Sequence, residues 1–123
     1  MATILIVDDD SGVADVVALV LEGQGHAPII ANSAAEAINS LSERDVDGAI
    51  LDVWLGKDDG LELAAELSRV GNPPPFIIMS GGGPGRSLET VTARADALGA
   101  HSVLYKPFDD DELIEAVRSL LPA

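Results

Sequence analysis

The chain has 123 residues, of which 47% are hydrophobic, and this suits one folded domain and excludes a disordered chain. No apolar run approaches the roughly 18–20 residues of a membrane-spanning helix, and the N-terminus lacks the basic region of a signal peptide. The formal net charge of −14 disfavours direct binding to nucleic acid or to an anionic membrane, and it favours a cation or a basic partner surface.

Five short runs of apolar residues, many of them branched, are predicted to be strands. Continuous apolar runs of this length are typical of strands that are buried on both faces of a parallel sheet. In chain order the runs are Thr3–Val7, Ala27–Ala31, Gly48–Leu51, Phe76–Met79 and Ser102–Tyr105. Pro28 lies near the start of the second run, where an edge strand would tolerate it.

Each run is followed by a segment with apolar residues at helical spacing. The expected helices contain Val13–Leu21, Ser33–Leu41, Leu61–Leu67, Leu88–Leu98 and Asp109–Leu121. Two of them begin with a capping box, in which a Ser or Asp is followed three residues later by a Glu. Strict alternation of strands and helices predicts a parallel sheet with helices on both faces, and nothing in the sequence divides residues 1–123 into two domains.

Polar side chains stand where four of the predicted strands end. Asp8 and Asp9 follow the first strand, Asp52 follows the third, Ser80 the fourth and Lys106 the fifth. In open parallel sheets, sites form beyond the carboxyl ends of the strands. We therefore expect three carboxylates, a hydroxyl and an ammonium to meet at one edge of the sheet.

This set of groups indicates phosphoryl chemistry that depends on a metal ion. Clustered carboxylates repel one another without a cation, and Mg²⁺ prefers oxygen ligands. Asp52 is a candidate nucleophile that would form an acyl phosphate, and the cation, Lys106 and Ser80 would each serve one phosphoryl oxygen.

Each of these residues taken alone has an ordinary structural explanation. The run Asp8–Asp10 could cap a helix, and we expect Asp10 to do only this. Asp52 and Ser80 could be turn residues, and Lys106 could be solvated. Their joint placement at strand ends favours a functional site.

The sequence resembles a receiver domain of the bacterial two-component response-regulator family. The resemblance covers essentially the whole chain and rests on Val7–Asp10, on Leu51–Asp52 followed by Asp59–Gly60, on Met79–Ser80 and on Lys106–Phe108. It implies a flavodoxin-like (βα)5 fold, a doubly wound five-stranded parallel sheet in the order 2-1-3-4-5, with residues 1–123 forming the receiver domain.

The resemblance also implies a role for each residue at the predicted site. Asp52 would be the phosphoacceptor, and the Lys106–Pro107 bond would be cis. The other roles are metal binding by Asp8, Asp9, Asp52 and the backbone carbonyl of Trp54, a conformational switch at Ser80, and phosphate contact by Lys106. The implied cofactor is Mg²⁺. The protein would phosphorylate itself and could dephosphorylate itself, rather than act as a turnover enzyme.

The implied phosphodonor is a phosphohistidine on a histidine kinase or on a histidine phosphotransfer protein. Output would be contact with a downstream protein target or onward phosphotransfer, with no direct DNA binding and no membrane insertion. Because the chain has no cysteine and no signal peptide, we expect it in the cytoplasm.

The sequence departs from the family pattern at three positions. Val103 stands where an aromatic residue often lies three residues before the lysine, Gly81 follows Ser80 in place of the common alanine, and Gly56 replaces a frequent proline. Tyr105 shares a strand face with Val103 by two-residue alternation, so we interpret these two residues as a switch or partner surface.

Three alternatives stay open. A haloacid-dehalogenase-like phosphohydrolase would need an Asp two residues after the nucleophile, where this chain has Trp54. The side chain of Trp54 is a candidate partner contact. The second alternative is a receiver-like module that signals without phosphorylation, and the third is a receiver that belongs to a hybrid kinase.

Overall fold

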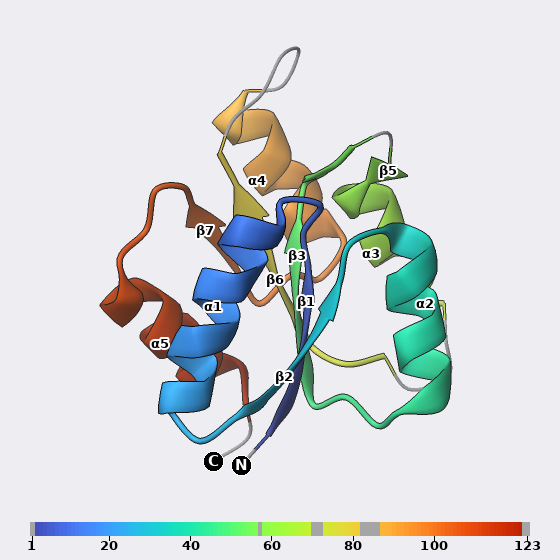
Figure 1. Ribbon diagram of the computed structural model, residues 1–123. Helices are drawn as coiled ribbons and strands as arrows, with labels where there is room; N and C mark the ends of the chain where they lie inside the picture. Colours follow the sequence, from blue (N-terminus) through green and yellow to red (C-terminus); the bar gives the residue numbers. More distant parts are fainter. Residues whose placement is uncertain (1, 57, 70–72, 82–86, 122–123) are drawn as a thin grey trace.

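The computed structural model describes residues 2–56, 58–69, 73–81 and 87–121. Its centre is a five-stranded sheet in the order β2-β1-β3-β6-β7, with every neighbouring pair parallel (Figure 1). The strands are β1 (Thr3–Val7), β2 (Ala27–Ala31), β3 (Gly48–Asp52), β6 (Phe76–Ser80) and β7 (Ser102–Tyr105). This is the predicted flavodoxin-like order, and Pro28 does lie in an edge strand.

Helices cover both faces of the sheet (Figure 1). The bounds are α1 (Ser11–Gly23), α2 (Ala34–Glu43), α3 (Gly60–Leu67), α4 (Leu88–Ala97) and α5 (Asp110–Leu120). Helices α1 and α5 pack together on one face, and α2, α3 and α4 share the core on the other. None of the helices in the described ranges is long and apolar enough to cross a membrane.

The core is divided by the sheet because successive side chains of a strand point to opposite faces. In β1, Leu5 and Val7 belong to the cluster beneath α2, α3 and α4, whereas Ile4 and Ile6 belong to the cluster beneath α1 and α5. All four side chains have no exposed surface. The central strands are thus apolar on both faces, as their continuous runs predict.

The expected helix starts are confirmed. The Asp10 carboxylate caps α1 by accepting hydrogen bonds from Gly12 and Val13 N–H at 3.0 and 3.2 Å. Ser33 caps α2 by accepting a hydrogen bond from Glu36 N–H at 3.2 Å, and Asp109 caps α5. These side chains satisfy N–H groups that have no partner inside the helix.

A two-stranded antiparallel hairpin follows β3 and was not predicted. It pairs β4 (Trp54–Leu55) with β5 (Asp58–Asp59). Strands of two residues are too short to show a hydrophobic period, so the sequence pattern cannot reveal them. Gly56 lies in this hairpin with a φ of 65°, a left-handed conformation that proline cannot adopt. The absence of the frequent proline at this position therefore has a structural reason.

Candidate functional site

Three buried polar side chains stand at the carboxyl edge of the sheet in the described part of the chain. Asp8 follows β1 with no exposed surface, Asp52 ends β3 with 5% of its surface exposed, and Ser80 ends β6 with none. Because these strands are adjacent and parallel, their ends meet, as the sequence predicts. The strands therefore hold two carboxylates in a place where water cannot fully solvate them.

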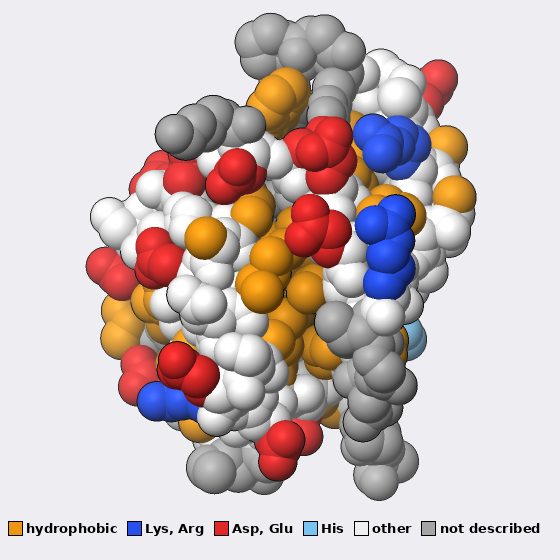
Figure 2. All heavy atoms as spheres, turned by 90° about the vertical axis from the view of Figure 1, so that its right-hand side faces the viewer, with side chains coloured by type: hydrophobic (Ala, Val, Ile, Leu, Met, Phe, Trp, Pro, Cys, Tyr) orange, Lys and Arg blue, Asp and Glu red, His pale blue; other side chains and the backbone are white. Residues whose placement is uncertain are grey.

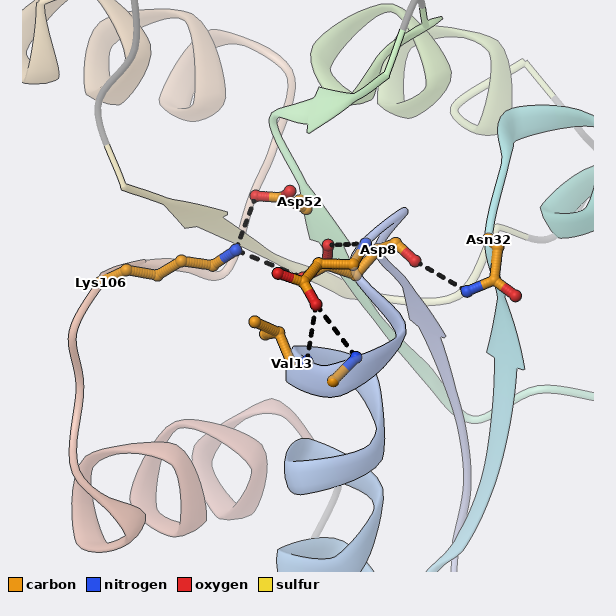
Figure 3. Close-up of polar contacts among 7 residues, drawn as sticks. Asp8, Val13, Asn32, Asp52 and Lys106 are labelled. Atoms are coloured by element: carbon orange, nitrogen blue, oxygen red, sulfur yellow. Dashed lines mark hydrogen bonds and ion pairs between the residues drawn. The ribbon is translucent and has the colours of Figure 1, made fainter.

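Lys106 lies between these two carboxylates. Its Nζ atom is 3.2 Å from Asp8 Oδ2 and 3.2 Å from Asp52 Oδ1 (Figure 3). Its backbone N–H donates to the Ser80 carbonyl at 2.8 Å, and the Lys106–Pro107 peptide bond is cis. The ammonium thus bridges the ends of β1 and β3 from a chain position fixed to the end of β6.

Burial and neighbouring charge change the protonation of both partners. Burial is the largest influence on Asp52, and with the Asp8 charge it outweighs Lys106 and raises the Asp52 pKa from 3.8 to about 6. Burial lowers the pKa of the Lys106 ammonium, but Asp52 and Asp8 together outweigh that effect and raise it. The Lys106 side chain is therefore held charged, and the Asp52 pKa lies closer to neutral pH than that of an ordinary carboxyl group.

Asp8 is held by further hydrogen bonds. Its Oδ1 atom accepts from Asp10 N–H at 3.0 Å, and its carbonyl oxygen accepts from Asn32 Nδ2 at 3.0 Å (Figure 3). The sequence pattern at Asn32 does not by itself indicate this contact. A usable signal was its place directly after β2, at the same edge of the sheet.

The carboxylates of Asp8, Asp9 and Asp52 form a cluster that could hold a metal ion. One oxygen of each lies within 4.8 Å of the others, and Asp9 is the exposed member. A Cβ atom at Gly56 would lie 3.3 Å from Asp9 Oδ2, so the hairpin passes close to this carboxylate. A cation reaching the cluster would find oxygen ligands on a solvent-facing side.

The three remaining predicted residues are Trp54 in β4 and Val103 and Tyr105 in β7. Trp54, in β4, is partly buried and packs against the core. Val103 is partly buried in the core beneath α4, whereas Tyr105 is 40% exposed and its hydroxyl hydrogen-bonds the Thr92 hydroxyl of α4. Val103 and Tyr105 thus face α4 together, as two-residue alternation predicts.

The fold and this edge define an α/β protein with a flavodoxin-like sheet and an acidic, metal-competent site that contains a lysine. The sequence model of the response regulator receiver domain matches residues 4–118, and the chain belongs to this family. It is therefore a receiver domain of the kind that serves phosphoaspartate signalling in two-component systems.

Relatives and solved structures agree with this assignment. The chain is 35% identical to the transcriptional regulatory protein GlrR of Escherichia coli (strain K12) over 98% of its own length and 26% of GlrR. It is 35% identical to the receiver domain of NtrX from Brucella abortus, with a TM-score of 0.84 and coverage of 95% and 97%.

A further solved structure is a response regulator protein from Burkholderia pseudomallei, described as having a phosphorylated aspartic acid, a calcium ion and citrate. It is 27% identical, with a TM-score of 0.83 and coverage of 94% of this chain and 66% of that one. The chain spans between about a quarter and a half of the length of the curated relatives it matches.

Proposed function

We propose that Asp52 accepts a phosphoryl group from a phosphohistidine donor in a reaction that depends on Mg²⁺. The observation that carries the proposal is the position of Asp52, which is buried at a strand end, 3.2 Å from the Lys106 ammonium and within the Asp8–Asp9 cluster. A nucleophile with a charged partner on one side and carboxylates that could hold a cation on the other suits phosphoryl transfer.

The donor set fits a hard divalent cation. Its atoms are carboxylate oxygens, the ligand type that Mg²⁺ prefers, and no nitrogen or sulfur ligand belongs to the cluster of described residues. Asp8, Asp9, Asp52 and the Trp54 carbonyl would hold the ion. Bound there, it would neutralise charge on the phosphoryl oxygens. The Burkholderia pseudomallei regulator, with its phosphorylated aspartic acid and calcium ion, supports this choice.

The transfer step exchanges one bond to phosphorus for another. A carboxylate oxygen of Asp52 attacks phosphorus, the P–N bond to the donor imidazole breaks, and its electron pair returns to the imidazole nitrogen. The product is an acyl phosphate on Asp52. Lys106, which pairs with Asp52 Oδ1, would then pair with a phosphoryl oxygen, and Ser80 on the neighbouring strand would donate its hydroxyl to another.

A protein donor fits the surface beside the site. A mostly apolar hollow next to Lys106 is lined by side chains of α1 and of the segment after β7. Its apolar residues include Val13, Val16, Pro107 and Phe108. A small phosphate compound would bury little of this apolar surface. A histidine kinase or a histidine phosphotransfer protein could cover the whole hollow and gain free energy from burying it. Output would reach a downstream protein through the α4-facing residues Val103 and Tyr105.

The test uses acetyl phosphate or beryllofluoride with Mg²⁺, followed by amide NMR and Trp54 fluorescence. Wild type should respond only when Mg²⁺ is present, and Asp52→Asn should not respond. Lys106→Ala should still bind Mg²⁺ but show a weaker conformational response. Absence of any Mg²⁺-dependent response in the wild-type protein would refute the proposal and favour the alternative of a receiver-like module that signals without phosphorylation.

A further inference from the structure

Gly60, the first residue of α3, lies directly against the backbone of the strand end that carries Asp52. A Cβ atom at this position would lie 1.9 Å from the Asp52 carbonyl oxygen, 2.8 Å from its carbonyl carbon and 3.1 Å from Val53 Cα. All three are main-chain atoms, so no side-chain rotation could relieve the overlap. The Gly60 N–H also donates to the Val53 carbonyl at 2.9 Å.

The need for glycine here comes from the contact and not from backbone conformation. Among the described glycines, those with positive φ are Gly25, Gly56 and Gly99, so Gly60 has a φ that alanine can adopt. Alanine is also a better helix former than glycine. Any residue with a Cβ at this position would therefore overlap the Asp52 backbone, although its own backbone conformation would be allowed.

The contact closes a loop around the site. The chain leaves β3 at Asp52, passes through the β4–β5 hairpin, in which Trp54 pairs with Asp59, and returns to Asp52 at Gly60. Asp59 caps α3 by accepting a hydrogen bond from Leu61 N–H at 2.8 Å, which fixes the first turn of the helix. Leu61 is buried in the core, so this turn cannot move freely.

We propose that Gly60 is a positioning residue. It lets the first turn of α3 rest on the Asp52–Val53 backbone, and it thereby sets the Asp52 carboxylate against Asp8 and Asp9, with one oxygen of each within 4.8 Å of the others. The proposal rests on the proposed function, because the quantity that it explains is the affinity of this cluster for Mg²⁺ and the reactivity of Asp52.

The test compares Gly60→Ala with Gly23→Ala. Both substitutions add one methyl group to a helix, but a Cβ at Gly23 has no atom within 4 Å. Gly60→Ala should weaken Mg²⁺ binding by about tenfold or more, a loss typical of residues that orient metal ligands, and should slow labelling by acetyl phosphate. Gly23→Ala should change neither. Calorimetric titration of Mg²⁺ measures the affinity, and circular dichroism at the same temperature measures the folded fraction.

A second pair of variants keeps the test decisive if Gly60→Ala does not fold. Asp59→Asn and Asp59→Ala remove the same charge, but asparagine can still cap α3 and alanine cannot. Asp59→Ala should bind Mg²⁺ more weakly than Asp59→Asn, since its first turn is no longer fixed against Asp52. Equal affinities for this pair would overturn the proposal.

The outcomes separate the two proposals. If wild type does not bind Mg²⁺ or react with acetyl phosphate, the proposed function fails. If wild type responds and folded Gly60→Ala has the wild-type affinity and labelling rate with only a lower melting temperature, Gly60 is merely structural and this inference fails alone.

Discussion

The bodies of the central strands and their carboxyl ends are equally buried but differ in chemistry. In β3, Ile50 and Leu51 have no exposed surface, and Asp52, the next residue, has 5%. The apolar residues gain free energy from burial, of the order of 1.5–3 kcal/mol for a large side chain. The charged residue loses its hydration at the same depth, and burial accordingly raises its pKa to about 6.

This difference indicates that the strand bodies stabilise the fold, whereas the buried charges at the carboxyl edge destabilise it. The strand bodies hold the carboxyl edge in place, and the edge keeps two carboxylates and an ammonium in an arrangement that is costly to bury. Removal of a buried apolar side chain from the strand bodies should therefore lower the free energy of unfolding, whereas removal of the Asp52 charge from the edge should raise it.

The largest effect is expected from Leu51→Ala, in the body of β3. Loss of a fully buried leucine should lower the free energy of unfolding by about 3 kcal/mol, within the usual range for core leucines. Leu19→Ala is the matched control, because Leu19 on α1 is 67% exposed and should change stability by less than about 0.5 kcal/mol. Urea unfolding followed by circular dichroism measures both. Equal losses would show that burial does not distinguish the two leucines.

The next largest effect is expected from Lys106→Met, which keeps the length of the side chain but removes the ammonium. In the absence of metal it leaves Asp8 and Asp52 without their shared cation. Because 25% of the lysine side chain is exposed, we expect a loss of about 2 kcal/mol, below the roughly 3–5 kcal/mol of a fully buried pair.

The control for this substitution is Arg118→Met, which breaks the exposed ion pair with Glu115. An exposed pair of this kind should contribute less than about 1 kcal/mol. The loss from Lys106→Met should also be greater at pH 8 than at pH 5, since the raised pKa of Asp52 allows a proton to neutralise this carboxylate at the lower pH. A loss that is independent of pH would show that the lysine acts through packing and not through charge.

Asp52→Asn should have the opposite sign and stabilise the metal-free protein. The pKa of Asp52 is about 6 in the folded protein against an ordinary value of 3.8, so the folded state binds this proton more tightly than the unfolded state. The stabilising contribution of the protonated form is present near pH 4 and is lost as the pH rises to about 6. Above that pH, the asparagine variant should be more stable by about 1–3 kcal/mol.

Urea unfolding in EDTA at several pH values between 4.5 and 8 measures this difference. The advantage of Asp52→Asn over wild type should grow through the window between pH 4 and 6 and then level off. An advantage that is constant over the whole range would contradict a raised pKa for Asp52.

The strand bodies could be predicted from the sequence because a continuous apolar run identifies a strand that is buried on both faces. The gathering of Asp8, Asp52 and Lys106 could also be predicted, since the carboxyl ends of adjacent parallel strands must meet at one edge. Helix starts at Asp10 and Ser33 followed from local capping chemistry, which depends on neighbours in the sequence.

Contacts between residues far apart in the sequence could not be predicted in this way. The hydrogen bond from Asn32 to the Asp8 carbonyl and the close approach of Gly60 to Asp52 depend on side-chain directions and loop paths. A glycine in a sequence indicates conformational freedom, and at Gly60 the backbone does not use that freedom. The bridge formed by Lys106 required the orientation of its side chain, which spacing alone does not give.

The smallest effect is expected from adding Mg²⁺, which should offset part of the cost of burying the carboxylates. At a free Mg²⁺ concentration tenfold above the dissociation constant, linkage gives about 1.4 kcal/mol of added stability for wild type. The stability advantage of Asp52→Asn over wild type should shrink by a similar amount, because this variant loses one ligand of the Asp8–Asp9–Asp52 cluster.

Sodium chloride at equal ionic strength controls for screening of the net charge of −14. Asp15→Asn, at an exposed position on α1, should keep the wild-type response to Mg²⁺. If sodium chloride stabilises wild type as much as Mg²⁺ does, the effect is screening over the whole surface, and the carboxyl edge does not hold a cation.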